Sequence, residues 1–239
     1  MEWHKYLAKL TKFDQQCGQL TLAHKKIKAT QATVKAYSMR QIPPTSLPKL
    51  SFSEHYLELH MLKHPELFAL ASCLADLRQT LIENFGVWHV FSQVWLTDLK
   101  KELQPGKSLV LMCGNAILAA QLPDAIAVDD LDWQKQDNTT PRPWRTVEKM
   151  DALLAVEKYC EQVDNIILEW APEQTTCDTA ILAFLRTKKW AGKFIVIGER
   201  QGATNSQAFW QQAQVNAPPS LNVHHQPFDF ISDRVYVVT

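Results

Sequence analysis

The sequence lacks the cysteine pattern of a disulfide framework and of a zinc finger. Its five cysteines are scattered over 239 residues without a Cys-x-x-Cys pair, and an odd number of dispersed thiols is typical of a reducing compartment. No apolar run approaches the ~20 residues that span a bilayer. The first residues, Met1–Lys5, lead into a polar amphipathic stretch rather than the apolar core of a signal peptide. We therefore expect a soluble, cytoplasmic protein without a membrane partner.

The histidines and the charge pattern give little support for a metal or nucleic-acid site. His60 and His64 lie four residues apart, but no Glu follows His60 as in a His-Glu-x-x-His motif, and such pairs need further ligands. We expect no bound metal. Residues 1–50 hold nine Lys and Arg against Glu2 and Asp14, a charge excess that suits phosphates. No interleaved aromatic motif accompanies these charges, so a solvated helix face is the favoured interpretation and nucleic acid stays an unsupported alternative.

The N-terminal part of the chain shows helical spacing of apolar residues. Trp3, Leu7 and Leu10 begin a series that predicts two helices before residue 40. Prolines then interrupt regular structure, because proline lacks an N–H and biases the preceding residue away from the helix. Further helices are expected at His55–Lys63, from Pro65 to Gly86, and along Trp88, Phe91, Trp95 and Leu99. We divide the chain into a helical region, residues 1–86 with a linker at about 41–50, and a second domain, residues 87–239.

The pattern changes at Ser108–Met112, a continuous apolar run typical of a strand buried on both faces of a parallel sheet. Further strands and helices follow, and their alternation indicates βαβ units. The strands are expected at Ala125–Val128, around Thr146–Met150, at Asn165–Trp170 and at Phe194–Gly198, and the helices at Ala116–Leu122, Ala152–Tyr159, Thr179–Trp190 and Gln207–Val215.

The end of the chain is informative about topology. The last two expected strands, Leu221–Phe230 and Arg234–Val238, are separated by only three residues. A parallel partner needs a crossover of about a dozen residues, so these strands must pair antiparallel if they are neighbours. The expected fold class is α/β: a doubly wound, mostly parallel seven-stranded sheet with an antiparallel C-terminal hairpin, preceded by an all-helical N-terminal region.

The order of these elements resembles that of the class I S-adenosylmethionine (SAM) methyltransferases, a Rossmann-like family, over residues 88–239. The loop after the first strand occupies the place of the family's acidic-x-Gly-x-Gly-x-Gly motif, and only Gly114 survives of its glycines. Val110, Met112 and Ala116 stand at the acidic, first-glycine and last-glycine positions. Glycine there lets the backbone approach the cofactor closely and turn into the next helix. The chain thus resembles a divergent member with an eroded glycine motif.

The resemblance implies a site for SAM, and for its product S-adenosylhomocysteine (SAH), outside the carboxyl ends of the strands, where open α/β sheets bind ligands. Its cofactor-binding residues are the loop residues Cys113, Gly114 and Asn115, the acids Asp129 and Asp130 beside the ribose, and Met150, Asp151 and Ala152 beside the adenine.

Several of these residues also have a structural interpretation. Gly114 permits a simple turn, and Asp129 and Asp130 are suitable polar residues for the end of a strand. Asp151 suits a helix N-cap as well as it suits a cofactor contact. Cys113 is flanked by apolar residues, which favours a small buried thiol over a nucleophile.

The fourth strand ends in a further part of the resemblance. Glu169, Trp170 and Pro172 stand where many members carry a short acidic or Asn, proline and aromatic motif that faces the reacting methyl group. The resemblance implies that Glu169 orients the substrate or acts as a general base, and that Trp170 forms an aromatic wall. Packing and turn roles for Trp170 and Pro172 are the alternative.

Two functions are compatible with the sequence. The first is a SAM-dependent methyltransferase acting on a small-molecule or other unknown substrate. The second is a catalytically inactive methyltransferase-like binding or scaffold protein that contacts a partner through its basic N-terminal helices. Val110, Met112 and the polar stretch Gln134–Arg145, which replaces the helix expected between strands two and three, favour the second. A nicotinamide-dependent oxidoreductase would require Gly-x-Gly-x-x-Gly, and Gly114 alone stands in that window.

Overall fold

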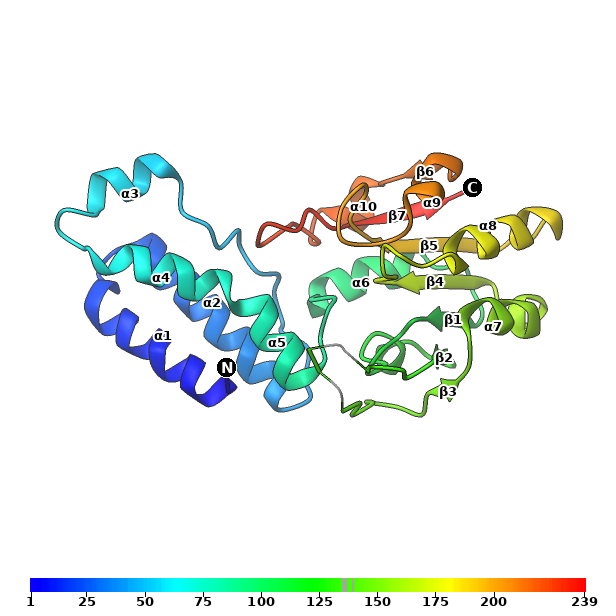
Figure 1. The fold of residues 1–239 in the computed structure, drawn as a ribbon, viewed down its shortest axis with the longest axis horizontal. Helices are drawn as coiled ribbons and strands as arrows, with labels where there is room; N and C mark the ends of the chain where they lie inside the picture. Colours follow the sequence, from blue (N-terminus) through cyan, green and yellow to red (C-terminus); the bar gives the residue numbers. More distant parts are fainter. Residues whose placement is uncertain (135–136, 139) are drawn as a thin grey trace.

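The computed structural model describes residues 1–134, 137–138 and 140–239. Its N-terminal region consists of helices (Figure 1): α1 (Trp3–Cys17), α2 (Thr21–Ser38), α3 (Glu54–His60), α4 (Glu66–Ala75) and α5 (Leu77–Phe85). The two helices expected before residue 40 are confirmed. The stretch expected as one helix from Pro65 to Gly86 is two helices, because the backbone departs from helical geometry at Asp76, where ψ is −2°. Gly86 ends α5 in the left-handed region, with a φ of 62°.

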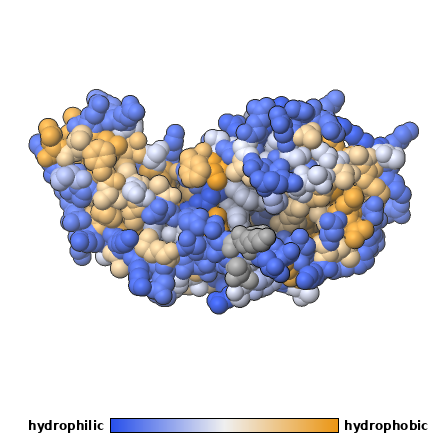
Figure 2. All heavy atoms as spheres, viewed as in Figure 1, coloured by the Kyte–Doolittle hydropathy of each residue, from blue (hydrophilic) through white to orange (hydrophobic). Residues whose placement is uncertain are grey.

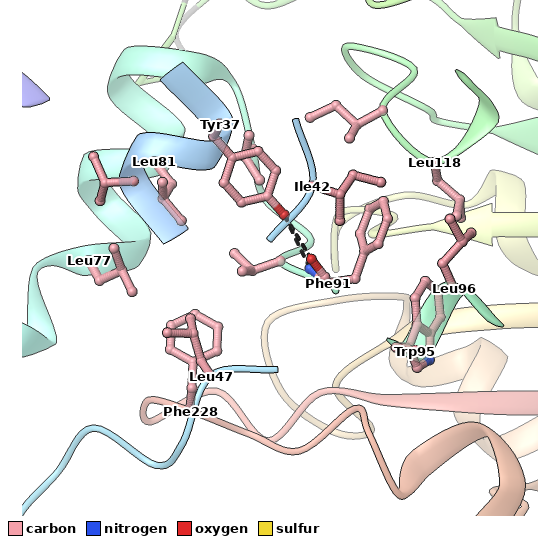
Figure 3. Packing of buried hydrophobic residues seen from close by; sticks show 14 of the residues in the cluster. Tyr37, Ile42, Leu47, Leu77, Leu81, Phe91, Trp95, Leu96, Leu118 and Phe228 are labelled. Carbon is pink, nitrogen blue, oxygen red and sulfur yellow. Dashed lines mark hydrogen bonds between the residues drawn. The ribbon is translucent and has the colours of Figure 1, made fainter. Parts of the chain in front are cut away.

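The segment at residues 41–50 forms no helix or strand, but it is held against the rest of the protein. The side chains of Leu47 and Leu50 are buried, and the Leu50 N–H donates to the Phe228 carbonyl at 2.7 Å. Figure 3 shows Leu47 beside Phe228, below the α5 residue Leu77. The segment therefore connects the helical region to a loop near the C-terminus through a shared core.

The helix expected along Trp88, Phe91, Trp95 and Leu99 begins later than its periodicity indicates. It is α6 (Gln93–Glu102), and the residues between Gly86 and Ser92 run without a helix. Ser92 is extended and its hydroxyl accepts the Trp95 N–H at 3.2 Å, so it is the N-cap. The expectation for Trp88 and Phe91 is thus wrong, and this non-helical segment, which bends at His89, reaches the cavity described below.

Seven strands form one sheet in the order β3-β2-β1-β4-β5-β7-β6. The neighbours from β3 to β5 pair in parallel, and β7 pairs antiparallel with both β5 and β6. This confirms the expected mostly parallel sheet with antiparallel C-terminal strands. The strands are β1 (Ser108–Leu111), β2 (Ile126–Asp129), β3 (Glu148–Lys149), β4 (Asn165–Glu169), β5 (Lys193–Gly198), β6 (Val215–Asn216) and β7 (Arg234–Val238).

The expected strand at Leu221–Phe230 is wrong. The sixth strand is β6, and the residues that follow it form the short helix α10 (Pro219–Asn222) and a loop. Proline at the first helical position suits a helix start. The Asn222 side chain then bonds the backbone of Val235 as both donor and acceptor, at 2.9 and 3.0 Å. Side-chain bonds therefore hold this segment beside β7 in place of a strand ladder.

Helices cover both faces of the sheet, as the doubly wound class requires. Alternate strand residues point to opposite faces: Leu109 and Leu111 pack on the side of α7, α8 and α9, and Val110 packs on the side of α6 and α10. The remaining helical elements are α7 (Ala152–Tyr159), α8 (Cys177–Thr187), α9 (Gln207–Gln212) and the 3-10 turns η1 (Ala119–Gln121) and η2 (Cys160–Gln162). The helix expected at Ala116–Leu122 is thus only the turn η1.

One hydrophobic core joins the N-terminal helices to the sheet. Its buried residues extend from Tyr6 in α1 through Trp95 in α6 to Val235 in β7. Within it the Tyr37 hydroxyl donates to the Phe91 carbonyl at 3.2 Å, which ties α2 to the non-helical segment (Figure 3). The carboxyl ends of the parallel strands face the N-terminal helices (Figure 1). In the described part of the chain, no helix combines the length and apolar character needed to cross a bilayer.

Candidate functional site

A cavity of about 480 Å³ lies at the carboxyl ends of β1, β2 and β4, beside the non-helical segment that follows α5. Small-molecule sites typically measure about 300–1,000 Å³. The structure brings together around this cavity every residue that the sequence placed in a catalytic or cofactor-binding role: Cys113, Gly114, Asn115, Asp129, Asp130, Met150, Asp151, Ala152, Glu169, Trp170 and Pro172.

The loop after β1 has a glycine-like backbone at two residues that are not glycine. Met112, Gly114 and Ala116 all have a φ of 52°, in the left-handed region. For a residue with a Cβ this conformation costs roughly 1–2 kcal/mol. The strained shape at Met112 and Ala116 is therefore maintained by the surrounding structure, and it is the shape that glycines at these positions would allow. Met112 packs partly against the core on the α7 side of the sheet, and the cavity stays open beside it.

Asp129 lines the cavity and is hydrogen-bonded to the backbone of two loops. Its Oδ2 accepts the Gly114 N–H and its Oδ1 accepts the Leu131 N–H, both at 2.8 Å. Burial raises the pKa of Asp129 above its ordinary value, and the two N–H groups oppose this shift. A carboxylate accepts about four hydrogen bonds, so Asp129 retains capacity for ligand hydroxyls. It holds the loops after β1 and β2 in register with each other.

Two other predicted residues have structural duties at the cavity. The Asn115 side chain donates to the Phe85 carbonyl and accepts the Arg142 N–H, both at 2.7 Å, which fastens the β1 loop to the end of α5. Asp151 caps α7, because its Oδ1 accepts the N–H groups of Leu153 and Leu154. The N-cap alternative for Asp151 is therefore confirmed, and its exposed carboxylate lies at the cavity as well.

The stretch Gln134–Arg145 lies between β2 and β3. Its residues Lys135, Gln136 and Thr139 lie outside the described part of the chain, and the remaining positions of the stretch form turns and loops without a helix. Asp137, within this stretch, lines the cavity.

The cavity is strongly acidic. Asp130, Asp132, Asp137 and Asp151 are exposed at its edge, while Asp129 and Glu169 are buried. Neither lysine nor arginine occurs among its described lining residues. Charge of one sign in a cleft attracts ligands of the opposite sign. The cavity therefore favours a cationic or neutral ligand and disfavours one that carries phosphate groups.

Aromatic rings line the other walls. Trp88 and Trp133 meet edge to face with their centroids 5.1 Å apart, and a Cβ on Gly114 would lie 3.8 Å from each ring. Trp170 has a φ of 56°, an outlier for a bulky residue, and the Arg78 guanidinium lies 4.9 Å from its ring centroid. The aromatic wall expected from Trp170 alone is thus built by three tryptophans.

Sequence reasoning missed His89. It lies in the non-helical segment after α5, and its Nδ1 is 2.9 Å from Oε1 of Glu169 at the end of β4. Burial lowers the pKa of His89 well below its ordinary value and raises the pKa of Glu169 to about 8. Burial therefore disfavours the charged form of both side chains. The helix stop at Gly86 and the N-cap serine at Ser92 are the signals that would have revealed a non-helical segment here.

Cys113 is a buried thiol. Only 5% of its surface is exposed, and burial together with the neighbouring Asp129 raises its pKa far above the ordinary range. A thiol in that state does not supply a thiolate nucleophile at neutral pH. The geometry favours the packing role expected for Cys113.

Comparison with protein-family models found no match, and comparison with curated proteins found none. Among solved structures, the chain is similar to a candidate O-methyltransferase from Nostoc punctiforme, with 12% sequence identity and a TM-score of 0.32. The aligned region covers 91% of this chain and 69% of the other.

Proposed function

We propose that the protein is a SAM-dependent methyltransferase. The observation that carries the proposal is the acidic cavity at the carboxyl ends of the strands, with six acidic residues, three tryptophans and no lysine or arginine among its described lining residues. SAM has a sulfonium and an ammonium group against one carboxylate, so it is a net cation. Aromatic faces and carboxylates together attract such a cation.

The residues of the cavity fit the parts of SAM. Asp129 has lone pairs left for the ribose hydroxyls after it accepts two backbone N–H groups. The left-handed backbone around Gly114 keeps side chains away from the place of the amino-acid part. Met150 and Ala152 flank Asp151 where the resemblance expects the adenine. Nucleotides that carry phosphates, such as NAD and ATP, find no lysine or arginine among the described lining residues to bind their phosphates.

When bound, SAM supplies an electrophilic methyl group on a positively charged sulfur. The chain's own residues bind and orient the two reactants and exclude water, and positioning of this kind supplies much of the rate of such a transfer. Trp170 and Glu169 end β4 at the inner part of the cavity, where they orient the methyl acceptor.

The experiment follows the fluorescence of the cavity tryptophans during titration with SAH. We expect saturable quenching by SAH, weakened about tenfold or more in Asp129→Asn, because the variant loses a charge that holds the loop and the ribose. Asp124→Asn is the matched control, since Asp124 is exposed and does not line the cavity. An unchanged SAH affinity in Asp129→Asn would count against this site.

A second function, a methyltransferase-like binding protein without catalysis, has support from another part of the molecule. Leu59, Leu62 and Phe68 expose 65%, 92% and 52% of their surface in and beside α3 and α4. Figure 2 shows apolar residues gathered at that end of the molecule. Exposed apolar groups that gather in this way mark contact surfaces for other molecules. SAH binding without any transfer of labelled methyl groups to extract components would favour this function, and labelling that Glu169→Gln abolishes would contradict it.

A further inference from the structure

His89 and Glu169 leave two buried polar atoms unpaired in the wall of the cavity. The residues expose only 4% and 7% of their surface, and they bond each other through Nδ1 and Oε1. The outer atoms, His89 Nε2 and Glu169 Oε2, have no hydrogen-bond partner among the described residues. Buried polar atoms are almost always paired. Two unpaired atoms beside one cavity therefore point to a ligand that pairs them.

The number of protons on the His89–Glu169 pair determines whether its outer atoms act as hydrogen-bond donors or acceptors toward that ligand. With Glu169 protonated and His89 neutral, one proton lies in the bond between them and the other lies on an outer atom. The pair then presents one donor and one acceptor. Burial raises the pKa of Glu169 to about 8, so above that pH the pair holds one proton and both outer atoms become acceptors.

The charged neighbours of the pair come from several elements. Asp129 on β2 lies near Glu169 and disfavours its ionisation. On the side of His89, the neighbouring charged or titratable groups are Arg78 on α5 and His225 and Asp233 on the loop between α10 and β7. His225 and Asp233 bond each other at 2.8 Å, and Arg78 bonds Asp229 at 2.6 Å and Asp233 at 3.3 Å, so these groups already have partners. The two unpaired atoms therefore belong to His89 and Glu169, and both of these residues line the cavity.

The charge of the cavity restricts the ligand further. Its five aspartates disfavour an anionic substrate, whereas they attract an ammonium group. An ammonium N–H has an acidity near that of lysine, with a pKa of about 10.4, so it gives up a proton to a base of this strength far more readily than a hydroxyl does. An aliphatic hydroxyl resembles water, with a pKa of about 15.7, and is a poor match for a base of this strength.

We infer that the methyl-accepting substrate is an amine, and that the His89–Glu169 pair binds its N–H groups and takes up the proton it releases. The inference rests on the proposed function. Binding of the ammonium displaces the Glu169 proton to solvent, and the ammonium then passes one of its own protons to the resulting carboxylate. The nitrogen lone pair freed in this way forms the N–CH₃ bond, while the electron pair of the S–CH₃ bond stays on the sulfur. His89 and Glu169 are thus substrate-binding groups whose second role is proton acceptance.

The test is calorimetric titration of the SAH-saturated protein with three matched probes, 2-phenylethylamine, 2-phenylethanol and 3-phenylpropionate. Their phenyl ring suits the tryptophan walls, and they differ in the polar group. We expect the amine to bind about tenfold or more tightly than the other two. We also expect it to displace a proton from Glu169 at pH 7, because a bound ammonium lowers the pKa of the carboxyl. Titrations in two buffers of different ionisation enthalpy measure that proton.

Glu169→Gln keeps the size of the side chain but removes its titration, so it loses both the amine preference and the proton release. His89→Asn keeps a bond to Glu169 and removes the outer nitrogen, so it weakens amine binding and serves if the first variant does not fold. Glu173→Gln is the matched control, because Glu173 is exposed and does not line the cavity.

Equal or tighter binding of the alcohol or the carboxylate would overturn the inference, as would amine binding with proton release that survives Glu169→Gln. Failure of SAH to bind contradicts the proposed function instead. The three probes are then titrated into the free protein, where the same comparison of amine, alcohol and carboxylate decides the role of the pair.

Discussion

Asp129 and Glu169 both end strands next to β1 and both line the cavity, but their carboxyl groups are satisfied differently. Each oxygen of Asp129 accepts a backbone N–H, so its burial is compensated within the chain while further lone pairs stay free for a ligand. Glu169 bonds only His89, and each partner keeps an unpaired atom. Asp129 therefore maintains the shape of the cavity as well as offering lone pairs to a ligand, whereas the outer atoms of His89 and Glu169 have no structural partner and are paired only by a ligand.

The largest expected effect is that of replacing Arg78, a buried charged neighbour of His89. Arg78 is buried, bonds Asp229 and Asp233, and donates to the Trp88 carbonyl. Arg78→Met leaves buried carboxylates without their partner, so we expect the free energy of unfolding to fall by about 3–5 kcal/mol. Chemical denaturation measures the loss. Arg142→Met, at an exposed position, should stay within about 0.5 kcal/mol of the parent; an equal effect of the two changes would contradict the role given to Arg78.

The pH dependence of stability comes next in size. The pKa of Glu169 is raised to about 8 in the folded protein, so between its ordinary pKa and this value the folded state holds a proton that the unfolded state has lost. Stability from this group is therefore present at low pH and is lost as the pH rises, by about 3 kcal/mol between pH 5 and pH 8. Denaturation curves at several pH values should show this slope in the parent and a flatter slope in Glu169→Gln. Identical slopes would mean that Glu169 is ionised.

Variants of Asp129 and of the His89–Glu169 pair should differ in their free energy of unfolding by about 2 kcal/mol. Asp129→Asn weakens two hydrogen bonds to a charged group, so we expect a loss of about 1–3 kcal/mol. The double variant His89→Phe with Glu169→Met removes both members of an incompletely paired network, which is expected to be neutral or stabilising. Thermal unfolding of the two variants ranks them. A double variant less stable than Asp129→Asn would show that the His89–Glu169 pair serves the fold.

The smallest expected effect tests the strained loop. Met112 has a φ of 52°, so Met112→Gly relieves strain of roughly 1–2 kcal/mol while it loses some packing. We expect unfolding free energy within about 1 kcal/mol of the parent and an SAH affinity that is kept or improved. Met112→Val is the contrasting change, because a β-branched residue fits this backbone region poorly and should be the less stable of the two. Loss of SAH binding in Met112→Gly would contradict the role given to the loop.

The sheet and half of the cavity were predictable because their signals are local. Buried parallel strands read as continuous apolar runs, and the residues that end them, such as Asp129 and Glu169, must gather at one edge of the sheet. His89 was not predictable in the same way, because the apolar spacing of Trp88 and Phe91 continues into α6 and imitates a helix. Gly86 and Ser92 are local signals against that helix, but only the tertiary structure shows that His89 lies beside Glu169.

Two other features required the structure for different reasons. Met112 and Ala116 adopt a left-handed backbone, which residues of these types rarely do. The residue types alone therefore indicated a loop without glycine-like geometry, and only the structure shows that geometry. The sixth strand was misplaced because the apolar residues after Pro219 belong to α10 and a packed loop, not to a ladder. Side-chain hydrogen bonds from Asn222 replace the strand pairing there, and the spacing of apolar residues does not predict such bonds.

The most direct measurement is calorimetric titration of the purified parent protein with SAM. A separate titration with NAD, which carries phosphate groups, is the comparison. The acidic lining, without lysine or arginine among the described residues, should give saturable SAM binding and no NAD binding over the same concentrations. Binding of NAD as tight as that of SAM, or no heat from SAM at millimolar concentration, would contradict the assignment of this cavity to a cationic methyl donor.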